Sequence, residues 1–185
     1  PAQENRRPGP QAGRLGRVAW EIERRFLVSV PEAHWLQLGE GDHLRQGYVR
    51  NGEPSLRIRT GEARGAVIAS KRGKGIRREE YEAVIPIEIA EALFMEAEDR
   101  IIEKIRWKIG PWELDRFLGA LEGLALLEIE LEDEADEIPP SPEGIHVLRE
   151  VTDDNRFVSG RLARLDEKKQ RKFVKQAYKE VKGWK

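Results

Sequence analysis

The chain has 185 residues, 39% of them hydrophobic and 36% charged, and Lys+Arg 33 against Asp+Glu 34 leave a formal net charge of -1. This length favours one domain, and the balanced charge argues against a globally basic surface for nucleic acid. Because cysteine is absent, disulfides, iron–sulfur clusters, thiolate zinc sites and cysteine nucleophiles are excluded.

Residues 1–17 combine Pro, Gly, Gln and Arg with almost no large apolar side chain. This composition predicts a flexible extension ahead of a single domain over residues 18–185. The extension lacks the apolar segment of a signal peptide, and no apolar run approaches the ~20 residues of a transmembrane helix. We therefore expect a cytoplasmic protein that does not enter a membrane.

Alternation of apolar and charged residues predicts a strand over residues 18–28, with Glu21, Glu23 and Arg25 on one face. A turn at Asn51-Gly52 is a strong hairpin signal between two of the following strands. Further strands are expected over residues 44–50, 54–60, 66–72, 76–85, 103–110, 111–117 and 124–133. Helical segments are expected over residues 31–38, 86–99 and 117–124 (a short helix or turn), an acidic, proline-rich loop over 132–144, and a basic amphipathic helix over 162–185.

The charged faces of these strands carry arginines two apart, glutamates two apart, and a Lys-x-Arg, while the opposite faces carry Trp, Ile, Leu and Phe. A solvated antiparallel sheet also alternates in this way. A closed barrel with charged faces inside and apolar faces under helices accounts for both features and removes exposed edges. The interior would hold basic and acidic candidates together, namely Arg25, Arg57, Arg59, Lys71, Arg78, Lys104, Arg106, Glu21, Glu23, Glu80, Glu82, Asp115, Glu128 and Glu130.

A buried cage of both signs is either a salt-bridged interior or a site for a ligand that needs both signs, such as a polyphosphate with its metal. Arginine and lysine bind phosphate oxygens. Carboxylates hold Mg²⁺ or Mn²⁺, which share their oxygen ligands with substrate phosphates. The absence of cysteine and of clustered histidine agrees with a hard, oxygen-bound ion.

EIERRFLV at residues 21–28 resembles the opening Glu-x-Glu-x-Lys motif of the CYTH superfamily, also called triphosphate tunnel metalloenzymes. Further blocks match in order: QGYVR, LRIR, a strand ending at Lys71, RREEYE, KIRW, WELDRF, LLEIEL and REVTDD. The resemblance runs from about Glu21 to Gly160. It implies an α+β fold with an eight-stranded antiparallel closed β-barrel, a tunnel with a charged lumen and helices packed outside, which binds triphosphate compounds and cleaves them with a divalent metal.

The resemblance also implies roles for the lumen residues. The implied metal ligands are Glu21, Glu23, Glu128 and Glu130. The implied triphosphate cradle is Arg57, Arg59, Lys71, Arg78, Lys104 and Arg106. Glu80, Glu82 and Asp115 would hold a second metal, orient the attacking water, or only balance the neighbouring arginines. Arg25 stands where the family has lysine; it keeps the charge but cannot release a proton near neutral pH, and Ser159-Gly160 replaces a frequent Ser-Asn.

We expect a metal-dependent triphosphatase that acts on inorganic triphosphate, because the chain offers no obvious second module for a nucleoside or RNA. Thiamine triphosphatase, nucleoside triphosphatase and class IV adenylate cyclase activities share the tunnel motifs and remain alternatives. Aromatic residues at the tunnel mouth would favour an organic substrate, and the sequence does not place Trp35, Tyr48 or Trp112 there. Because of Arg25, a non-catalytic polyphosphate- or nucleotide-binding module also remains.

The expected partner is thus a small-molecule triphosphate, and nucleic acid is not expected. Lysines of the C-terminal helix could nevertheless form a nucleic-acid or partner surface, although a solvated face is the commoner explanation. The sequence leaves the oligomeric state open, a homodimer included.

Overall fold

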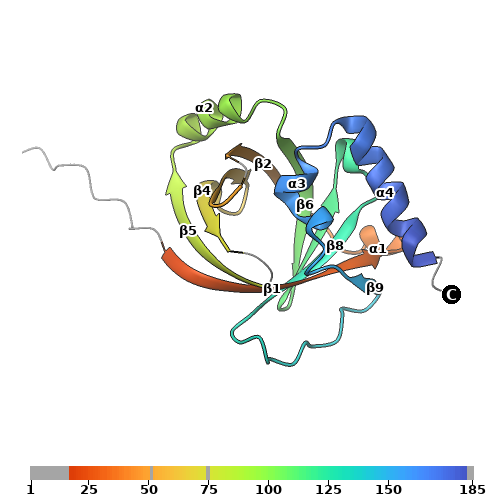
Figure 1. Cartoon of the computed structure of the whole chain (residues 1–185). Helices are drawn as coiled ribbons and strands as arrows, with labels where there is room; N and C mark the ends of the chain where they lie inside the picture. Colours follow the sequence, from red (N-terminus) through yellow and green to blue (C-terminus); the bar gives the residue numbers. More distant parts are fainter. Residues whose placement is uncertain (1–16, 51, 74–75, 183–185) are drawn as a thin grey trace, which may run out of the picture.

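In the computed structural model, which describes residues 17–50, 52–73 and 76–182, nine strands form one antiparallel sheet. The strands are β1 (Arg17–Ser29), β2 (Asp42–Arg50), β3 (Ser55–Gly61), β4 (Gly65–Arg72), β5 (Arg77–Ile85), β6 (Ile101–Ile109), β7 (Trp112–Phe117), β8 (Ala125–Leu131) and β9 (His146–Glu150). Their order is β5-β4-β3-β2-β6-β7-β8-β1-β9, and β5 also pairs with β1, so that β1 to β8 close into a barrel (Figure 1). The predicted eight-stranded closed antiparallel barrel is therefore confirmed.

The first strand, β1, is long enough to pair with three others. Residues 17–22 pair with β5, residues 22–27 with β8 and residues 26–29 with β9. The residues of β1 that pair with β8 overlap those that pair with β5 and those that pair with β9. β8 therefore lies along one edge of β1, and β5 and β9 lie one after the other along its opposite edge. Between them, the backbone N–H of Arg25 donates to Thr152 Oγ1 at 3.0 Å, and the N–H of Val151 donates to the Arg25 carbonyl at 2.8 Å. The segment after β9 thus continues the edge pairing at Arg25.

Helices and a loop cover apolar residues on the outside of the barrel. The helix α2 (Ile87–Ala97) contacts β2, β3 and β4, and its buried Ala90 and Phe94 pack with Ile58. The short helix α1 (Glu32–Trp35) and the loop after β8 contribute to a second cluster around Trp107 and Trp112. Burial of these outward-facing apolar side chains supplies much of the driving force that closes the barrel.

Toward one end of the barrel the inward-facing side chains change from charged to apolar. Leu27 follows Arg25 on the inner face of β1 and lies opposite Leu126, which precedes Glu128 on β8. Both belong to a buried cluster that also contains residues of the 3-10 turns η1 (Gly119–Leu121) and η2 (Asn155–Phe157) and of the helices α3 (Ser159–Leu162) and α4 (Glu167–Lys182). This apolar end of the interior is therefore filled by the C-terminal part of the chain.

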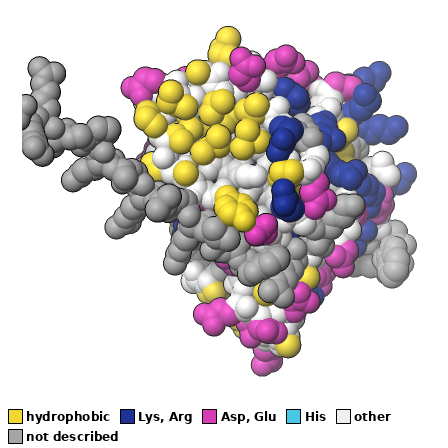
Figure 2. Space-filling model, turned by 60° about the vertical axis from the view of Figure 1, so that its left-hand side comes forward, with side chains coloured by type: hydrophobic (Ala, Val, Ile, Leu, Met, Phe, Trp, Pro, Cys, Tyr) yellow, Lys and Arg dark blue, Asp and Glu magenta, His cyan; other side chains and the backbone are white. Residues whose placement is uncertain are grey.

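The outer surface gathers residues of different kinds in different places. Figure 2 shows a group of hydrophobic side chains on one part of the molecule and lysine and arginine side chains on another. Exposed apolar residues on the outside of β5 and α2 include Tyr81, Ile87 and Ile89. None of the helices in the described ranges has the length and hydrophobicity needed to span a lipid bilayer.

Several expected boundaries differ from the structure. The C-terminal helix was expected from residue 162 but begins at Glu167, because the Asp166 carboxylate accepts the backbone N–H of Lys169 at 2.8 Å and caps the helix there. The strand β9 was not predicted, and the helix expected over 31–38 is confined to α1. Residues 1–16 of the expected extension and Asn51 of the expected turn lie outside the described residues, while Arg17 is the first residue of β1.

Candidate active site

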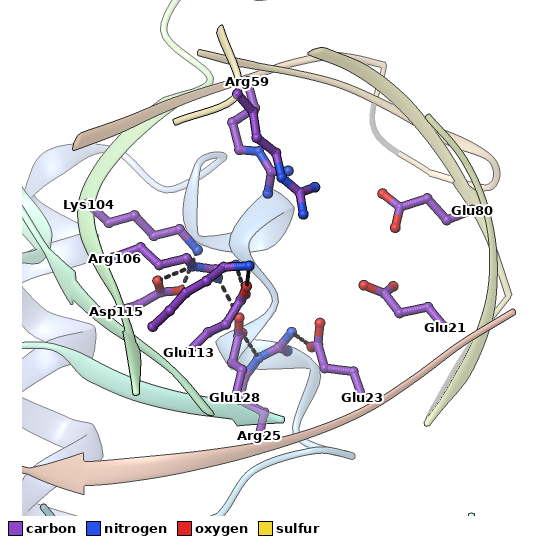
Figure 3. A network of polar contacts seen from close by, with 12 residues as sticks. Glu21, Glu23, Arg25, Arg59, Glu80, Lys104, Arg106, Glu113, Asp115 and Glu128 are labelled. Atoms are coloured by element: carbon purple, nitrogen blue, oxygen red, sulfur yellow. Dashed lines mark hydrogen bonds and ion pairs between the residues drawn. The ribbon is translucent and has the colours of Figure 1, made fainter. Parts of the chain in front are cut away.

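Strand register places all of the site residues expected from the sequence on the inner face of the barrel. Residues directly opposite each other in an antiparallel pair share a face, and such pairs include Glu21 with Arg78, Arg25 with Glu128, Lys71 with Glu80, and Arg106 with Asp115. Figure 3 shows the labelled members of this set pointing toward one another across the interior. The strands thus bring together side chains that lie up to about a hundred positions apart in the sequence.

Arg25 lies between two carboxylates on the β1–β8 side. Its Nε donates to Glu128 Oε1 at 2.6 Å, and its Nη2 pairs with Glu23. The Arg25 side chain is only 8% exposed. Burial alone would lower the pKa of Arg25, but Glu23 and Glu128 outweigh it and raise that pKa. One guanidinium therefore holds two glutamates that were predicted to bind metal.

Arg106 on β6 is the centre of a second set of ion pairs. It donates to both oxygens of Asp115, from Nε and Nη2 at 2.6 Å each, and from Nη2 to Glu128 Oε2 at 2.7 Å. The fully buried Asp115 also pairs with Lys104. Burial and the nearby Arg106 lower the pKa of Lys104. Although burial would raise the pKa of Glu128, the cations Arg25, Lys104 and Arg106 hold it well below its usual range.

A third set of ion pairs lies on the side formed by β3, β4 and β5. Lys71 Nζ contacts Glu21 Oε2 at 2.7 Å and Glu80 Oε2 at 3.4 Å. Arg78 Nη2 contacts Glu23 Oε1 at 3.1 Å and Glu21 Oε2 at 3.4 Å. Arg57 Nη2 contacts Glu80 Oε1 at 3.2 Å and Glu82 Oε2 at 3.7 Å, and Arg59 Nη2 contacts Glu82 Oε2 at 3.5 Å. The contacts of Arg57 and Arg59 are longer than those around Asp115, which leaves these two arginines less fully neutralised.

Two features of the cations suit an anionic ligand. Burial, followed by the neighbouring Arg57, Arg106 and Arg64, lowers the pKa of Arg59 to about 10. In addition, the buried Nε–H groups of Arg57 and Arg78 have no hydrogen-bond partner within the described part of the chain. A phosphate oxygen would satisfy such donors and relieve the repulsion among the arginines.

The carboxylates show the matching feature for a cation. Glu23 lies directly opposite Glu130, and Glu113 directly opposite Glu128, although like charges in such positions are destabilising. Partial burial and the neighbouring Glu21 and Glu113 raise the pKa of Glu130. These oxygen donors suit Mg²⁺ or Mn²⁺. In the described residues, however, no three acidic or histidine side chains are arranged so that they could hold a metal, since most of the glutamates are turned toward cations.

Glu113 was not among the site residues proposed from the sequence. It pairs with Arg106 and, at 3.5 Å, with Lys108. Its alternation with Asp115 along the predicted strand over 111–117 was the signal that could have placed it in the lumen.

Of the aromatic residues left unplaced by the sequence, Trp35 and Trp112 lie outside the lumen, and Tyr48 lies where its charged and apolar parts meet, directly opposite Arg57. Trp35 packs on Trp107 at 5.3 Å between ring centroids, and Trp112 packs on Phe26 at 5.8 Å, both in the outer cluster. Tyr48 lies in the apolar end, where Gln46 Nε2 donates to its hydroxyl at 3.2 Å and burial raises its pKa. Trp35 and Trp112 therefore do not line the lumen, and the ring of Tyr48 is packed in its apolar end beside Arg57.

Comparison with known proteins gives a consistent result. Residues 19–146 match the profile of the CYTH domain. The chain is 38% identical over 150 residues to an inorganic triphosphatase of Acetivibrio thermocellus, covering 78% of this chain and 93% of that protein. It is 35% identical over 154 residues to an inorganic triphosphatase of Nitrosomonas europaea, covering 77% and 96%. A solved crystal structure of an inorganic triphosphatase matches with a TM-score of 0.53 at 33% identity, covering 79% of this chain and 95% of that one.

Proposed function

The chain belongs to the CYTH family, and from this premise we propose that it is a divalent-metal-dependent triphosphatase that cleaves a phosphoanhydride bond of inorganic triphosphate. The observation that carries the proposal is the lumen itself. Crowded arginines with unpaired donors face opposed pairs of glutamates inside one barrel. A triphosphate and its metal would neutralise both sets of charges.

The cradle for the triphosphate is formed by Arg57, Arg59, Lys71, Arg78, Lys104 and Arg106. The arginine forks bind pairs of phosphate oxygens, while the two lysines act as point charges. Because most of these side chains are already held by glutamates, they are oriented before the substrate arrives. Such preorganised cations stabilise the charge that develops on the transferring phosphoryl group and on the leaving group.

The residues that would hold the divalent ion are Glu21, Glu23, Glu128 and Glu130. The ion that we propose is Mg²⁺ or Mn²⁺, because the lumen offers only oxygen ligands of this kind. A bound ion of this class supplies Lewis-acid polarisation of phosphate oxygens and a water of lowered pKa.

The other lumen carboxylates divide into two groups. Asp115 has both oxygens engaged by Arg106 and Lys104 and is fully buried, so we assign it the positioning of these cations. Glu80 and Glu82 make longer ion pairs and retain some exposure. We propose that they orient the attacking water, with a second metal or simple charge balance as the alternatives. Arg25 adds charge stabilisation without proton transfer.

The lining of the lumen favours inorganic triphosphate over an organic triphosphate. Binding of a nucleoside or thiamine ring commonly uses stacking on aromatic side chains. The rings of Trp35 and Trp112 pack outside the barrel and Tyr48 lies at its apolar end. Although Tyr48 is opposite Arg57, its ring is buried in that apolar cluster and is not free to stack on a substrate, so the affinity would come from the phosphates alone.

Phosphate release by the purified protein tests this proposal. Inorganic triphosphate, thiamine triphosphate and ATP are compared with Mg²⁺, with Mn²⁺ and with EDTA, and the ATP reaction is also checked for cyclic AMP. We expect fast, metal-dependent release from inorganic triphosphate that is lost in Glu21→Ala/Glu23→Ala. Glu79→Ala, on the outer face of β5, is the matched control and should retain activity. Tight triphosphate binding without release from any substrate would instead identify a binding module.

A further inference from the structure

Three of the four proposed metal ligands are held by cations of the cradle. Glu21 pairs with Lys71 and Arg78, Glu23 pairs with Arg25 and Arg78, and Glu128 pairs with Arg25 and Arg106. Of the four, Glu130 alone makes no ion pair within the described ranges, and partial burial together with the surrounding carboxylates raises its pKa. In this arrangement the protein's own cations occupy the oxygens that a metal would need.

Arg25 is central to this competition between the protein's cations and a metal for the glutamate oxygens. Its single guanidinium bonds Glu23 and Glu128 at once, from two different strands. Its Nη2 and Nε are both used, and the side chain has little access to water. Because arginine does not deprotonate in proteins, Arg25 frees these glutamates only by transferring its hydrogen bonds to another anion.

The arriving triphosphate is such an anion. Its oxygens accept bidentate hydrogen bonds from guanidinium as carboxylates do. Once Arg25, Arg78 and Arg106 bind phosphate, Glu23 and Glu128 lose these cationic partners and must find another. A divalent ion, which prefers oxygen ligands, would fill that role.

On the basis of the proposed function, we propose that triphosphate and the divalent metal bind cooperatively, and that Arg25 is the positioning residue that couples them by exchanging glutamates for phosphate. Linkage requires the effect to be reciprocal: triphosphate strengthens metal binding by the same factor by which metal strengthens triphosphate binding. Coupling between sites is typically about 5- to 150-fold. Arg25 would therefore keep free metal out of the site until substrate is present.

Calorimetric titration of the full chain with Mn²⁺ measures this coupling. The titration is performed with and without a saturating non-hydrolysable triphosphate analogue (imido-bridged), and the Mn²⁺–analogue titration in buffer is subtracted. Thermal melts provide a second readout, because cooperative ligands stabilise together by more than the sum of their separate effects. We expect Mn²⁺ to bind at least about fivefold more tightly in the presence of the analogue.

Three variants test the part played by Arg25. Arg25→Met should bind Mn²⁺ more tightly without the analogue and lose most of the coupling. Arg25→Lys keeps a charge but cannot bridge both glutamates with one fork, so a folded Lys variant should show reduced coupling even if the Met variant does not fold. Arg24→Met is the matched control, because Arg24 points outward and pairs with Glu150; its coupling should equal that of the wild type.

The outcomes separate the two proposals. Equal Mn²⁺ affinity with and without the analogue in the wild type overturns the coupling but leaves the triphosphatase proposal standing. Full coupling in Arg25→Lys overturns the role of Arg25. Absence of Mn²⁺ binding under both conditions contradicts the metal-dependent function itself.

Discussion

Glu23 on β1 and Glu130 on β8 lie directly opposite each other across an antiparallel strand pair. Two like charges in this position destabilise a sheet, and among the described residues Glu23 forms ion pairs, with Arg25 and Arg78, whereas Glu130 forms none. The fold therefore bears a local electrostatic cost at the position where the proposed metal would bind. This is the trade between stability and function that is expected of an active site.

Removing one of these charges should stabilise the protein when no metal is bound. In EDTA, we expect Glu130→Gln to increase the free energy of unfolding by about 0.2–1 kcal/mol, which raises the Tm by up to about 4 °C. The variant should also lose metal-dependent phosphate release. Because the raised pKa lets the folded protein keep a proton that the unfolded chain releases, wild-type stability falls as the pH rises above the ordinary value of 4.5. The advantage of the variant should therefore grow with pH over that window.

Melts followed by circular dichroism between pH 4 and 8 check this expectation. Glu122→Gln, at an exposed turn, is the control and should show no such trend. A lower Tm for Glu130→Gln in EDTA at neutral pH would show that Glu130 is a structural carboxylate.

Arg59 should contribute to substrate binding at a cost in stability. Burial and three neighbouring arginines lower its pKa to about 10, so an Arg59→Met variant removes a crowded charge as well as a phosphate ligand. Loss of a charged hydrogen bond, about 1.5–3 kcal/mol, predicts a KM for triphosphate that is roughly 10- to 150-fold higher. The Tm without ligand should stay the same or rise.

Steady-state kinetics and melts of the same preparations measure both effects. Arg64→Met is the matched control, because Arg64 also pairs with Glu82 but its side chain is 60% exposed; its KM should change less than about fivefold. An unchanged KM together with a lower Tm in Arg59→Met would contradict the role in binding.

Tyr178 should anchor the C-terminal helix to the barrel. Its hydroxyl donates to the Val28 carbonyl and accepts the Ala125 N–H, both at 3.0 Å, and so joins α4 to β1 and β8. Tyr178→Phe leaves these backbone groups without that partner, and we expect a loss of about 1–3 kcal/mol in the free energy of unfolding. Urea denaturation measures it. The exposed Tyr81→Phe should change stability by less than about 0.5 kcal/mol, and a similar small change in Tyr178→Phe would refute the anchor.

The barrel and its inward charges could be predicted from the sequence because both follow from alternation along single strands. Because Glu21, Glu23 and Arg25 lie on one face of a strand, their side chains point to the same side of the sheet. Closure of the barrel determines only whether that side is the inside or the outside. The strand β9 could not be found in this way, since its five residues pair with β1 across more than a hundred positions. The early start expected for the C-terminal helix came from reading Leu162 and Leu165 as part of one stripe, whereas Asp166 begins a new helix.

The partners of each charge could not be predicted from the sequence either. Alternation places Arg25 and Arg106 in the lumen, but their shared carboxylate, Glu128, follows from the register of β1, β6, β7 and β8. Residues after Glu150 fill one end of the barrel. This arrangement depends on tertiary packing, which cannot be predicted from the local sequence pattern.

The mouth of the barrel, the end that carries the exposed side chains of Arg64, Val84 and Lys108, should control the choice between inorganic and organic substrates. Val84 is 78% exposed and lies opposite Val67, which lies opposite Arg59, so all three share the inner face. Val84→Trp would place an aromatic surface beside the phosphate cradle. Base stacking contributes about 1–3 kcal/mol, so the KM for ATP should fall by at least about fivefold while the KM for inorganic triphosphate stays constant. Val147→Trp, on β9, is the control for a new exposed ring. If Val84→Trp leaves the KM for ATP unchanged, the missing aromatic ring is not what disfavours organic triphosphates.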